Sequence, residues 1–358
     1  MATSLITEIP IFVFSSQIGD IELSTDQAKI EIRVEVGTTK MFKTMLYAYN
    51  GKVTIVNIGE VLENFMRANG LMFTAFTVYY NTAEGAYIGS FNLNTLYCSL
   101  KLDINPALFG SYNFLSTLTA KRVPRVFTEH LSILHGQESA QVKAHCVYED
   151  NNGEVANATV TLMNLITDDI GVTVRPFTSQ NIIAMLRVKG KNVKTLLSFR
   201  MEFNGRNMTY YTQDFMPNVV FSFKNCFNVY ETIYLNAVTT TKTKVNRSMA
   251  ISQGRQSFYD QSVDKTYEVE TAPMSQAEAE WVEQLFMSHS VRLGTASNPD
   301  TLPEVIITES TCEIDDNDEK LHQVKFTWQY VDHCPHLQTS AKTDESRIFT
   351  EPYNQTFN

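Results

Sequence analysis

A regular alternation of apolar and charged residues constrains the fold of this chain more than any other feature. Residues 30–36, IEIRVEV, place isoleucine or valine at every second position, with glutamate or arginine between them. Residues 324–330, VKFTWQY, repeat the alternation near the carboxyl end. Because successive side chains of a β-strand point to opposite faces, this period of two predicts strands with one buried and one solvated face. The chain is therefore predicted to be mainly β.

Tight turns between these strands are indicated by Asn-Gly pairs, since both residues tolerate the positive φ that a two-residue hairpin turn requires. Three such pairs lie between strand-like runs: Asn50-Gly51, Asn152-Gly153 and Asn204-Gly205. Glu84-Gly85 predicts a fourth hairpin, and the acidic residues 315–319 predict the tip of a fifth. Gly51, Gly153 and Gly205 are therefore expected to be structural residues that resist substitution.

Helices are predicted at three places. The best begins after Ser275, which forms a capping-box pattern with Glu278. Its apolar stripe, expected to anchor the helix to a sheet, consists of Trp281, Val282, Leu285 and Phe286. The second helix is predicted over residues 59–69 and the third, from a weaker pattern, over residues 179–188. Each stripe is typical of a helix that covers a sheet.

The length of 358 residues predicts two or three domains. The order of elements predicts multidomain β-sandwich or barrel modules with a few short helices: a β module over 1–118, a second over 119–218, a C-terminal β domain with one helix over 219–336, and an extended or disordered tail over 337–358. Strand, turn, strand, helix and hairpin follow one another over 40–95 and again over 140–213, which predicts a duplicated module. Residues 120–125 are interpreted as the linker between the two copies.

Charge and composition exclude several classes of protein. With 29 basic and 39 acidic side chains the net charge is −10, so the chain lacks the positive field that holds nucleic acid. Its longest apolar run, residues 71–76, is far shorter than the roughly 20 residues of a membrane span, so no membrane insertion is expected. Residues 1–17 lack the basic start of a secretory signal, and the five cysteines form no CxxC pair. Folding in the cytoplasm is therefore expected.

Motifs that carry chemistry are missing from the sequence. The phosphate-binding patterns GxGxxG and GxxxxGK[ST], the nucleophile turn GxSxG and the zinc motif HExxH do not occur. His322, His333, Cys334 and His336 lie near one another in sequence, but their spacing does not place a set of zinc ligands on one face. We predict no catalytic residue, no cofactor and no metal site, although a pair of distant carboxylates, as in β-rich glycoside hydrolases, stays open.

Two lysines share one face of a threonine-rich strand over residues 239–249. Lys242 and Lys244 fit an edge strand that is protected from pairing by charge. The alternative is that they dock electrostatically to an acidic neighbouring subunit, since the chain as a whole is acidic.

Several segments together resemble tail-associated structural proteins of phages and prophages of Bacteroidetes bacteria. They are residues 219–233, VVFSFKNCFNVYETI; residues 247–267; residues 274–288, MSQAEAEWVEQLFMS; residues 304–310, EVIITES; residues 326–332, FTWQYVD; and residues 50–66, NGKVTIVNIGEVLENFM. The carboxyl-terminal order of long strands, one helix and a closing hairpin is also similar to the phage tail-tube fold. The motifs of this resemblance are structural and contain no catalytic residue.

The resemblance implies a non-enzymatic virion component of the tail, a distal tail or baseplate-hub protein assembled in the cytoplasm of the host bacterium. Its partners would be further copies of itself, in a hexameric or trimeric ring, and other tail proteins. Two rival functions are carried forward. One is a carbohydrate-binding module or adhesin of the virion or cell surface, with a host-surface glycan as ligand; the other is a β-rich hydrolase that acts on cell-wall glycans.

Overall fold

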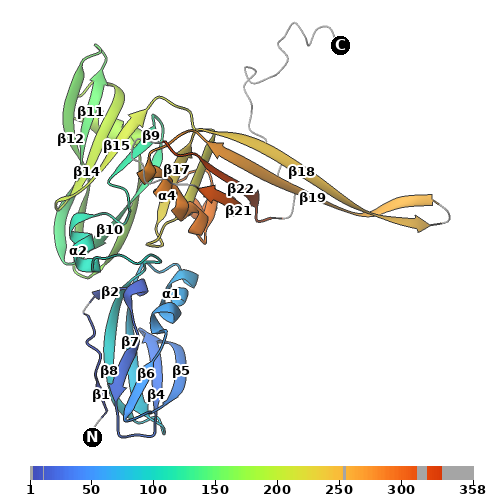
Figure 1. Cartoon of the computed structure of the whole chain (residues 1–358). Helices are drawn as coiled ribbons and strands as arrows, with labels where there is room; N and C mark the ends of the chain where they lie inside the picture. The colour runs from blue at the N-terminus through green and yellow to red at the C-terminus, as the bar shows by residue number, and fades with distance from the viewer. Residues whose placement is uncertain (1–2, 11, 253–254, 313–320, 333–358) are drawn as a thin grey trace.

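The structure is a computed structural model that describes residues 3–10, 12–252, 255–312 and 321–332. The described chain is mainly β, as predicted, and its strands form five sheets. Figure 1 shows three consecutive units, with the N-terminal unit at one end of the molecule. The predicted tail over 337–358 lies outside the described residues, and so do residues 315–319, the predicted tip of the fifth hairpin.

The N-terminal unit comprises two sheets and one helix. The five-stranded sheet has the order β2 (Phe12–Phe14), β8 (Tyr87–Leu96), β7 (Phe73–Thr82), β4 (Lys29–Val36) and β5 (Thr39–Tyr47). The three-stranded sheet has the order β1 (Ser4–Leu5), β3 (Ile21–Ser24) and β6 (Lys52–Ile55), and helix α1 spans Ile58–Ala68. Ile30, Ile32 and Val34 of the alternating run are fully buried and belong to the hydrophobic core of this unit.

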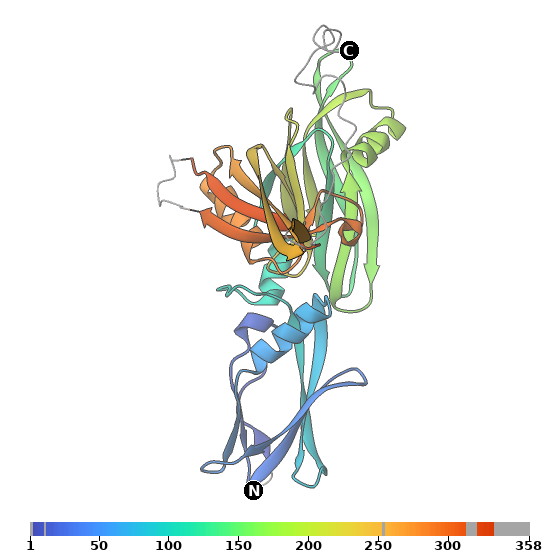
Figure 2. The ribbon, with the colours of Figure 1, turned by 90° about the vertical axis from the view of Figure 1, so that its right-hand side faces the viewer.

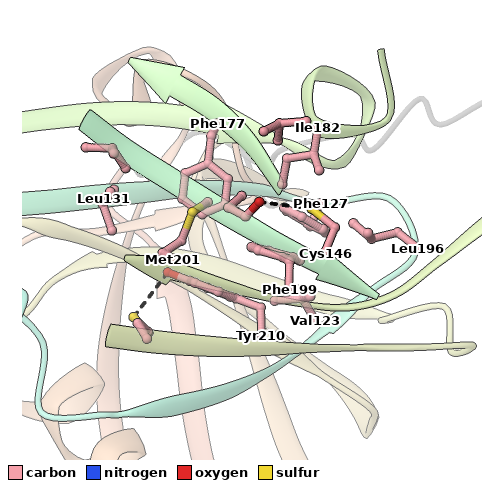
Figure 3. Close-up of a cluster of buried hydrophobic side chains, with 14 of the residues drawn as sticks. Val123, Phe127, Leu131, Cys146, Phe177, Ile182, Leu196, Phe199, Met201 and Tyr210 are labelled. Atoms are coloured by element: carbon pink, nitrogen blue, oxygen red, sulfur yellow. Dashed lines mark hydrogen bonds between the residues drawn. The ribbon is translucent and has the colours of Figure 1, made fainter. Parts of the chain in front are cut away.

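The middle unit follows helix α2 (Pro106–Tyr112). Its five-stranded sheet has the order β12 (Val155–Thr167), β11 (Glu138–Asp150), β14 (Val193–Phe203), β15 (Arg206–Gln213) and β9 (Ala120–Pro124). Strands β10 (Thr128–His135) and β13 (Gly171–Thr178) form a second sheet, and helix α3 spans Ser179–Val188. Between these elements lie packed aromatic rings, shown in Figure 3, among them Phe199 and Tyr210, which stack with ring centroids 4.7 Å apart.

These two units share one topology, which confirms the predicted duplication. In each, the five-stranded sheet contains two hairpins side by side, β4–β5 with β7–β8 and β11–β12 with β14–β15. In each, the first strand of the five-stranded sheet pairs parallel with the last, β2 with β8 and β9 with β15. The helices α1 and α3 occupy equivalent places in the two sequences of elements. The repeat therefore begins earlier than residues 40 and 140, at β2 and β9.

The interpretation of residues 120–125 as a linker is wrong. Residues Ala120–Pro124 form β9 at the edge of the middle sheet, and Lys121 and Val123 are only 5% and 0% exposed. The three basic residues of the segment pair with acids of the fold: Lys121 with Glu129, Arg122 with Glu278 and Arg125 with Asp214.

The C-terminal unit is one strongly curved sheet with a helix. Its order is β17 (Tyr230–Leu235), β16 (Val219–Lys224), β20 (Val291–Leu293), β21 (Glu304–Cys312), β22 (Val324–Tyr330), β19 (Arg255–Thr271) and β18 (Ala237–Ser252). Only Asn236 separates β17 from β18, although these strands form opposite edges of the sheet. The sheet must therefore curl until its two edges meet at Asn236. Figure 2 shows the unit beside the middle unit.

The predicted helices are confirmed, and one helix was missed. Helix α4 spans Gln276–Met287, and its capping box is complete: the Ser275 hydroxyl accepts from the Glu278 backbone N–H, and the Glu278 carboxylate accepts from the Ser275 N–H. The apolar stripes of α1 and α3 face the protein interior, with Leu62 of α1 and Ile182 of α3 among the buried residues. Helix α2 has no apolar stripe that stood out in sequence, but Asn105 caps it and Pro106 occupies its first turn.

The Asn-Gly turns differ from one another. Asn204 and Gly205 both have positive φ, 47° and 84°, and join β14 to β15 as predicted. Gly153 lies in the predicted β11–β12 hairpin, but Asn152 does not have positive φ, so that turn is not of the expected two-residue type. The turn at Gly51 has both positive values, yet it joins β5 to β6, which belong to different sheets. Glu84-Gly85 joins β7 to β8 as predicted.

Replacing Gly205 tests the cost of the left-handed backbone at such a turn. We expect Gly205→Ala to lower the free energy of unfolding by about 1–2 kcal/mol, because an L-residue is strained at this φ. Urea unfolding followed by circular dichroism measures the change. Gly19→Ala is the control, since Gly19 has neither positive φ nor an atom within 4 Å of an added Cβ. Equal losses in the two variants would contradict the prediction.

Candidate functional site

A long β-ribbon that leaves the body of the protein is the most distinctive candidate site. Strand β19 pairs with β22 only from Tyr267 to Glu270, whereas its pairing with β18 continues outward to Arg255. We call residues 241–266 the arm. Within the described residues the arm has two strands and no third one, and Figure 1 shows it projecting far from the three units.

One face of the arm continues the core side of the C-terminal sheet. At the base, Tyr267 and Val269 are buried in the core of the C-terminal unit, opposite Thr241 and Thr239. Because side chains alternate between faces, every second residue outward lies on this same side. We call it the core-side face of the arm; its residues are Thr243, Val245, Arg247, Met249 and Ile251 on β18, opposite Lys265, Val263, Gln261, Phe258 and Gln256 on β19.

Half of the residues of the core-side face are apolar, and most of these apolar side chains are exposed. Met249 and Phe258 lie opposite each other beyond a bulge, with 59% and 60% of their surfaces accessible, and Ile251 is 71% accessible. The Arg247 guanidinium lies 5.1 Å from the centre of the Phe258 ring. Large apolar side chains gathered on one face usually mark a contact surface. The side of the ribbon that is buried in the core at its base is therefore exposed farther out along the arm, where the described part of the chain does not cover it.

The opposite face of the arm is polar and carries the two predicted lysines. Lys242 forms an ion pair with Glu268, and Lys244 lies opposite Asp264. The Asn246 amide donates to the Asp264 carboxylate at 3.1 Å. Strand β18 is an edge strand of the seven-stranded sheet, as predicted, while the role of the lysines in preventing strand pairing stays a prediction. The ribbon is thus amphipathic, and Lys242 and Asn246 of its polar side are paired within the chain.

The arm differs in charge from the rest of the molecule. It contains five of the 29 basic residues but only two of the 39 acidic ones, so it carries +3 and the rest of the chain −13. On the core-side face the charged residues are Arg247 and Lys265, both positive. The arm therefore complements an acidic surface that has apolar side chains at its centre.

A groove of about 200 Å³ lies at the base of the arm, between α4 and the ends of β15 and β17. We call it the α4 groove. Its apolar lining includes Leu118, Leu235, Met274, Trp281 and Val282, and its accessible rim includes Ala272 and Asn236. Helix α4 contains three glutamates and no lysine or arginine. Glu278 lines the groove and is paired with Arg122 at 2.5 Å between Oε1 and Nε, while Glu280 and Glu283 add negative charge to the same helix.

A buried polar cluster holds α4 in place beneath the groove. The Trp281 indole N–H donates to Glu231 of β17 at 2.7 Å. The Lys121 ammonium of β9 lies 4.9 Å from the Trp281 ring centre and donates to Glu129 of β10 at 2.8 Å. The cluster thus ties the middle unit to the C-terminal unit. Burial raises the pKa of Glu129 to about 7, although the Lys121 ammonium partly opposes the rise.

The raised pKa of Glu129 predicts a pH-dependent stability. The folded protein holds this proton more tightly than an unfolded chain, whose glutamate pKa is about 4.3. The free energy of unfolding should therefore fall as pH rises from about 4.5 to about 7, by roughly 3 kcal/mol for this group. We expect Glu129→Gln to remove most of that fall, measured as urea midpoints at pH 5 and pH 7.5. Glu22→Gln, which alters the exposed Lys52 ion pair, should keep the wild-type slope; an unchanged slope in Glu129→Gln would contradict the assignment.

The predicted structural residues lie in separate places. Trp281 and Leu285 are buried and Phe286 is half-buried against Phe326, with ring centroids 5.5 Å apart. The structure brings Trp281 and Glu278 together in the α4 groove and places Lys242 and Lys244 on the arm. The remaining predicted structural residues lie outside both surfaces: Ser275 caps α4, and Gly51, Gly153 and Gly205 lie in turns of the other two units.

The sequence did not predict the buried polar cluster, and it predicted no set of metal ligands. Glu129 and Glu231 are the second residues of two strands, TEHLSILH and YETIYL, and an acid close to such apolar residues is the one signal that could have indicated a buried pair. His322 forms a β-bridge with Met274, and His333, Cys334 and His336 lie outside the described residues. Across the described residues there is neither a group of three metal-binding side chains nor a helix of the length and apolarity needed to cross a membrane.

Comparisons with known proteins leave the family open. No family model matches the chain, and no curated protein matches it. Among solved structures, the calcium-binding domain CBD12 of CALX1.1 is 12% identical, with a TM-score of 0.19, over 57% of this chain and 79% of that one. The plexin A4 extracellular region is 9% identical, with a TM-score of 0.21, over 94% of this chain and 40% of that one. Scores this low assign neither a shared fold nor a function.

Proposed function

We propose that this protein is a non-enzymatic structural component of a phage tail, a distal tail or baseplate-hub protein that assembles into a ring and connects other tail proteins. The observation that carries the proposal is the arm, whose apolar core-side face is left uncovered by the described part of its own chain. A surface of this kind supports a function that works through contacts between proteins.

The energetics of a two-stranded ribbon support assembly. An isolated hairpin is marginally stable in water, and three or more strands or a packing partner are normally needed. The arm gains that support when its apolar face is buried by another molecule. A contact between two different surfaces of identical chains closes into a ring when the rotation between neighbours is a whole fraction of a turn. Trimers and hexamers both meet this condition.

The resemblance to tail proteins points to the same unit. Residues 219–233 and 274–288 form β16, β17 and α4, and residues 247–267 belong to the arm. Three of the six segments that resemble tail proteins therefore lie at or beside the candidate contact surfaces. The similarity of the C-terminal domain to the tail-tube fold is part of this proposal.

Mass photometry of the full chain over a range of concentrations, with negative-stain imaging of any assembled peak, tests the proposal. We expect closed rings of one stoichiometry. The matched variant replaces residues 242–266 by Asn-Gly, a turn that fits because Thr241 and Tyr267 lie directly opposite each other. This variant should fold and remain monomeric. A wild-type chain that stays monomeric at every concentration would contradict self-assembly. In a separate assay, turnover of purified cell-wall glycan by the full chain would favour the alternative function of a β-rich hydrolase.

Glycan binding is the second candidate, favoured by two exposed tyrosines. Tyr47 and Tyr49, near the end of β5, are 75% and 80% accessible and lie two residues apart. Aromatic rings with an apolar face and a polar edge suit contact with sugars. A glycan array with the full chain tests this function. Saturable binding that is lost in Tyr47→Ala/Tyr49→Ala, by a chain that remains monomeric, would favour an adhesin over a ring component.

A further inference from the structure

The core-side face of the arm requires a partner with an apolar centre and negative charge. Its exposed apolar residues are Val245, Met249, Ile251 and Phe258, and its charged residues are Arg247 and Lys265. The rest of the chain carries −13, so the surface of a second copy has the complementary charge. The charge therefore identifies another copy of this chain as the occupant.

The α4 groove offers such a surface. It has an apolar lining that includes Trp281, Met274 and Leu235, and a volume of about 200 Å³ that can admit a large side chain such as Phe258. The two cations of its lining are paired within the chain, Lys121 with Glu129 and Arg122 with Glu278. Negative charge beside the groove comes from the other two glutamates of α4, Glu280 and Glu283. The groove lies at the base of the arm, while the apolar residues Met249 and Phe258 lie far out along it, so one chain presents the two surfaces at separate places.

We propose that the core-side face of the arm of one copy docks in the α4 groove of the next copy, with Phe258 and Met249 as the apolar anchors. The contact joins two different surfaces, so each copy gives an arm and receives one. Such a head-to-tail interface repeats around a closed ring. This inference rests on the proposed self-assembly and names the two surfaces that carry it.

A mixing experiment tests this geometry in the full chain. The arm variant is Met249→Ser/Phe258→Ser, which keeps an intact groove, and the groove variant is Ala272→Trp, which fills the groove from its accessible rim and keeps an intact arm. Each variant alone should be monomeric in mass photometry at concentrations where the wild type forms rings. Their equimolar mixture can form only one productive contact per pair, so it should yield dimers and no larger species.

The controls separate a failure of this inference from a failure of the proposed function. Ala107→Trp, at an exposed position of α2, should assemble like the wild type. If the wild type forms rings and Ala272→Trp forms them equally well, the groove is not the docking site, but self-assembly stands. If the mixture forms rings, the arm and the groove are not the two halves of one contact, and the inference is wrong. If the wild type forms no ring, the proposed function itself fails.

Photocrosslinking gives a second measurement that does not depend on the groove variant. Benzoylphenylalanine in place of Phe258 should yield a species of twice the chain mass. Mass spectrometry should map the crosslink to residues 118–122, 213–215, 233–236 or 271–282, which contain the lining residues of the groove. Crosslinks between two chains that map to any other surface would overturn the inference.

Discussion

Trp281→Ala should lower the free energy of unfolding by about 3–5 kcal/mol, the largest effect on stability that we expect from a single substitution. The side chain is 6% exposed and packs in the core of the C-terminal unit, with its ring centre 5.8 Å from that of Phe223. Its removal leaves a cavity and also deprives the buried Glu231 carboxylate of its indole donor. Chemical denaturation of the full chain, followed by tryptophan-independent far-UV circular dichroism, measures the loss.

Trp281→Phe is the matched variant, because it keeps an aromatic ring in the core and removes the hydrogen bond to Glu231. We expect a loss of roughly 1–3 kcal/mol, the cost of leaving a buried polar group unsatisfied. A Trp281→Ala protein with the wild-type denaturation midpoint would contradict the anchoring role of α4.

Met249→Ser/Phe258→Ser should raise the concentration needed for half-assembly by about 100-fold or more. Burying a large apolar side chain contributes roughly 1.5–3 kcal/mol, and each 1.4 kcal/mol changes an equilibrium constant about tenfold. Both side chains are exposed in the single chain, so the stability of the monomer should hardly change. Sedimentation velocity over a dilution series measures the assembly, and thermal unfolding measures the monomer.

The control exchanges Ala250 and Ser257, which lie opposite each other on the polar face of the arm, next to Met249 and Phe258. Ala250→Ser/Ser257→Ala keeps the composition and should leave assembly unchanged. An equal loss in both double variants would assign the effect to the ribbon as a whole and contradict a specific role for its core-side face.

Local patterns in the sequence predicted much of the secondary structure. The alternation at Ile30–Val34 gave a strand with a buried face, and the Ser275–Glu278 pair gave the start of α4. These features depend on residues within one turn or one strand. The repeat of elements likewise predicted a duplicated topology, because hairpins and helices keep their order along the chain.

Contacts between distant strands account for what the sequence did not predict. Lys121 of β9 pairs with Glu129 of β10, a strand of the other sheet of the middle unit. The packing of these two sheets on each other buries both side chains, and the local pattern around Lys121 does not predict it. The arm was predicted as strands, but the strands of the body and of the arm have the same local pattern. Whether a strand has one neighbour or two depends on pairings such as Glu270 with Lys325, far apart in the chain.

The pairing of first and last strands in the five-stranded sheets of the two repeated units has a consequence for synthesis. Phe12 pairs with Asn94, and Ala120 pairs with Thr209, so each five-stranded sheet stays incomplete until its final strand has left the ribosome. Since domains fold in order as they emerge, the N-terminal unit completes its sheet first and the middle unit second. The arm is translated only afterwards. The strands of both units have therefore found their partners before the uncovered face of the arm appears, so none of them is left free to pair with the arm.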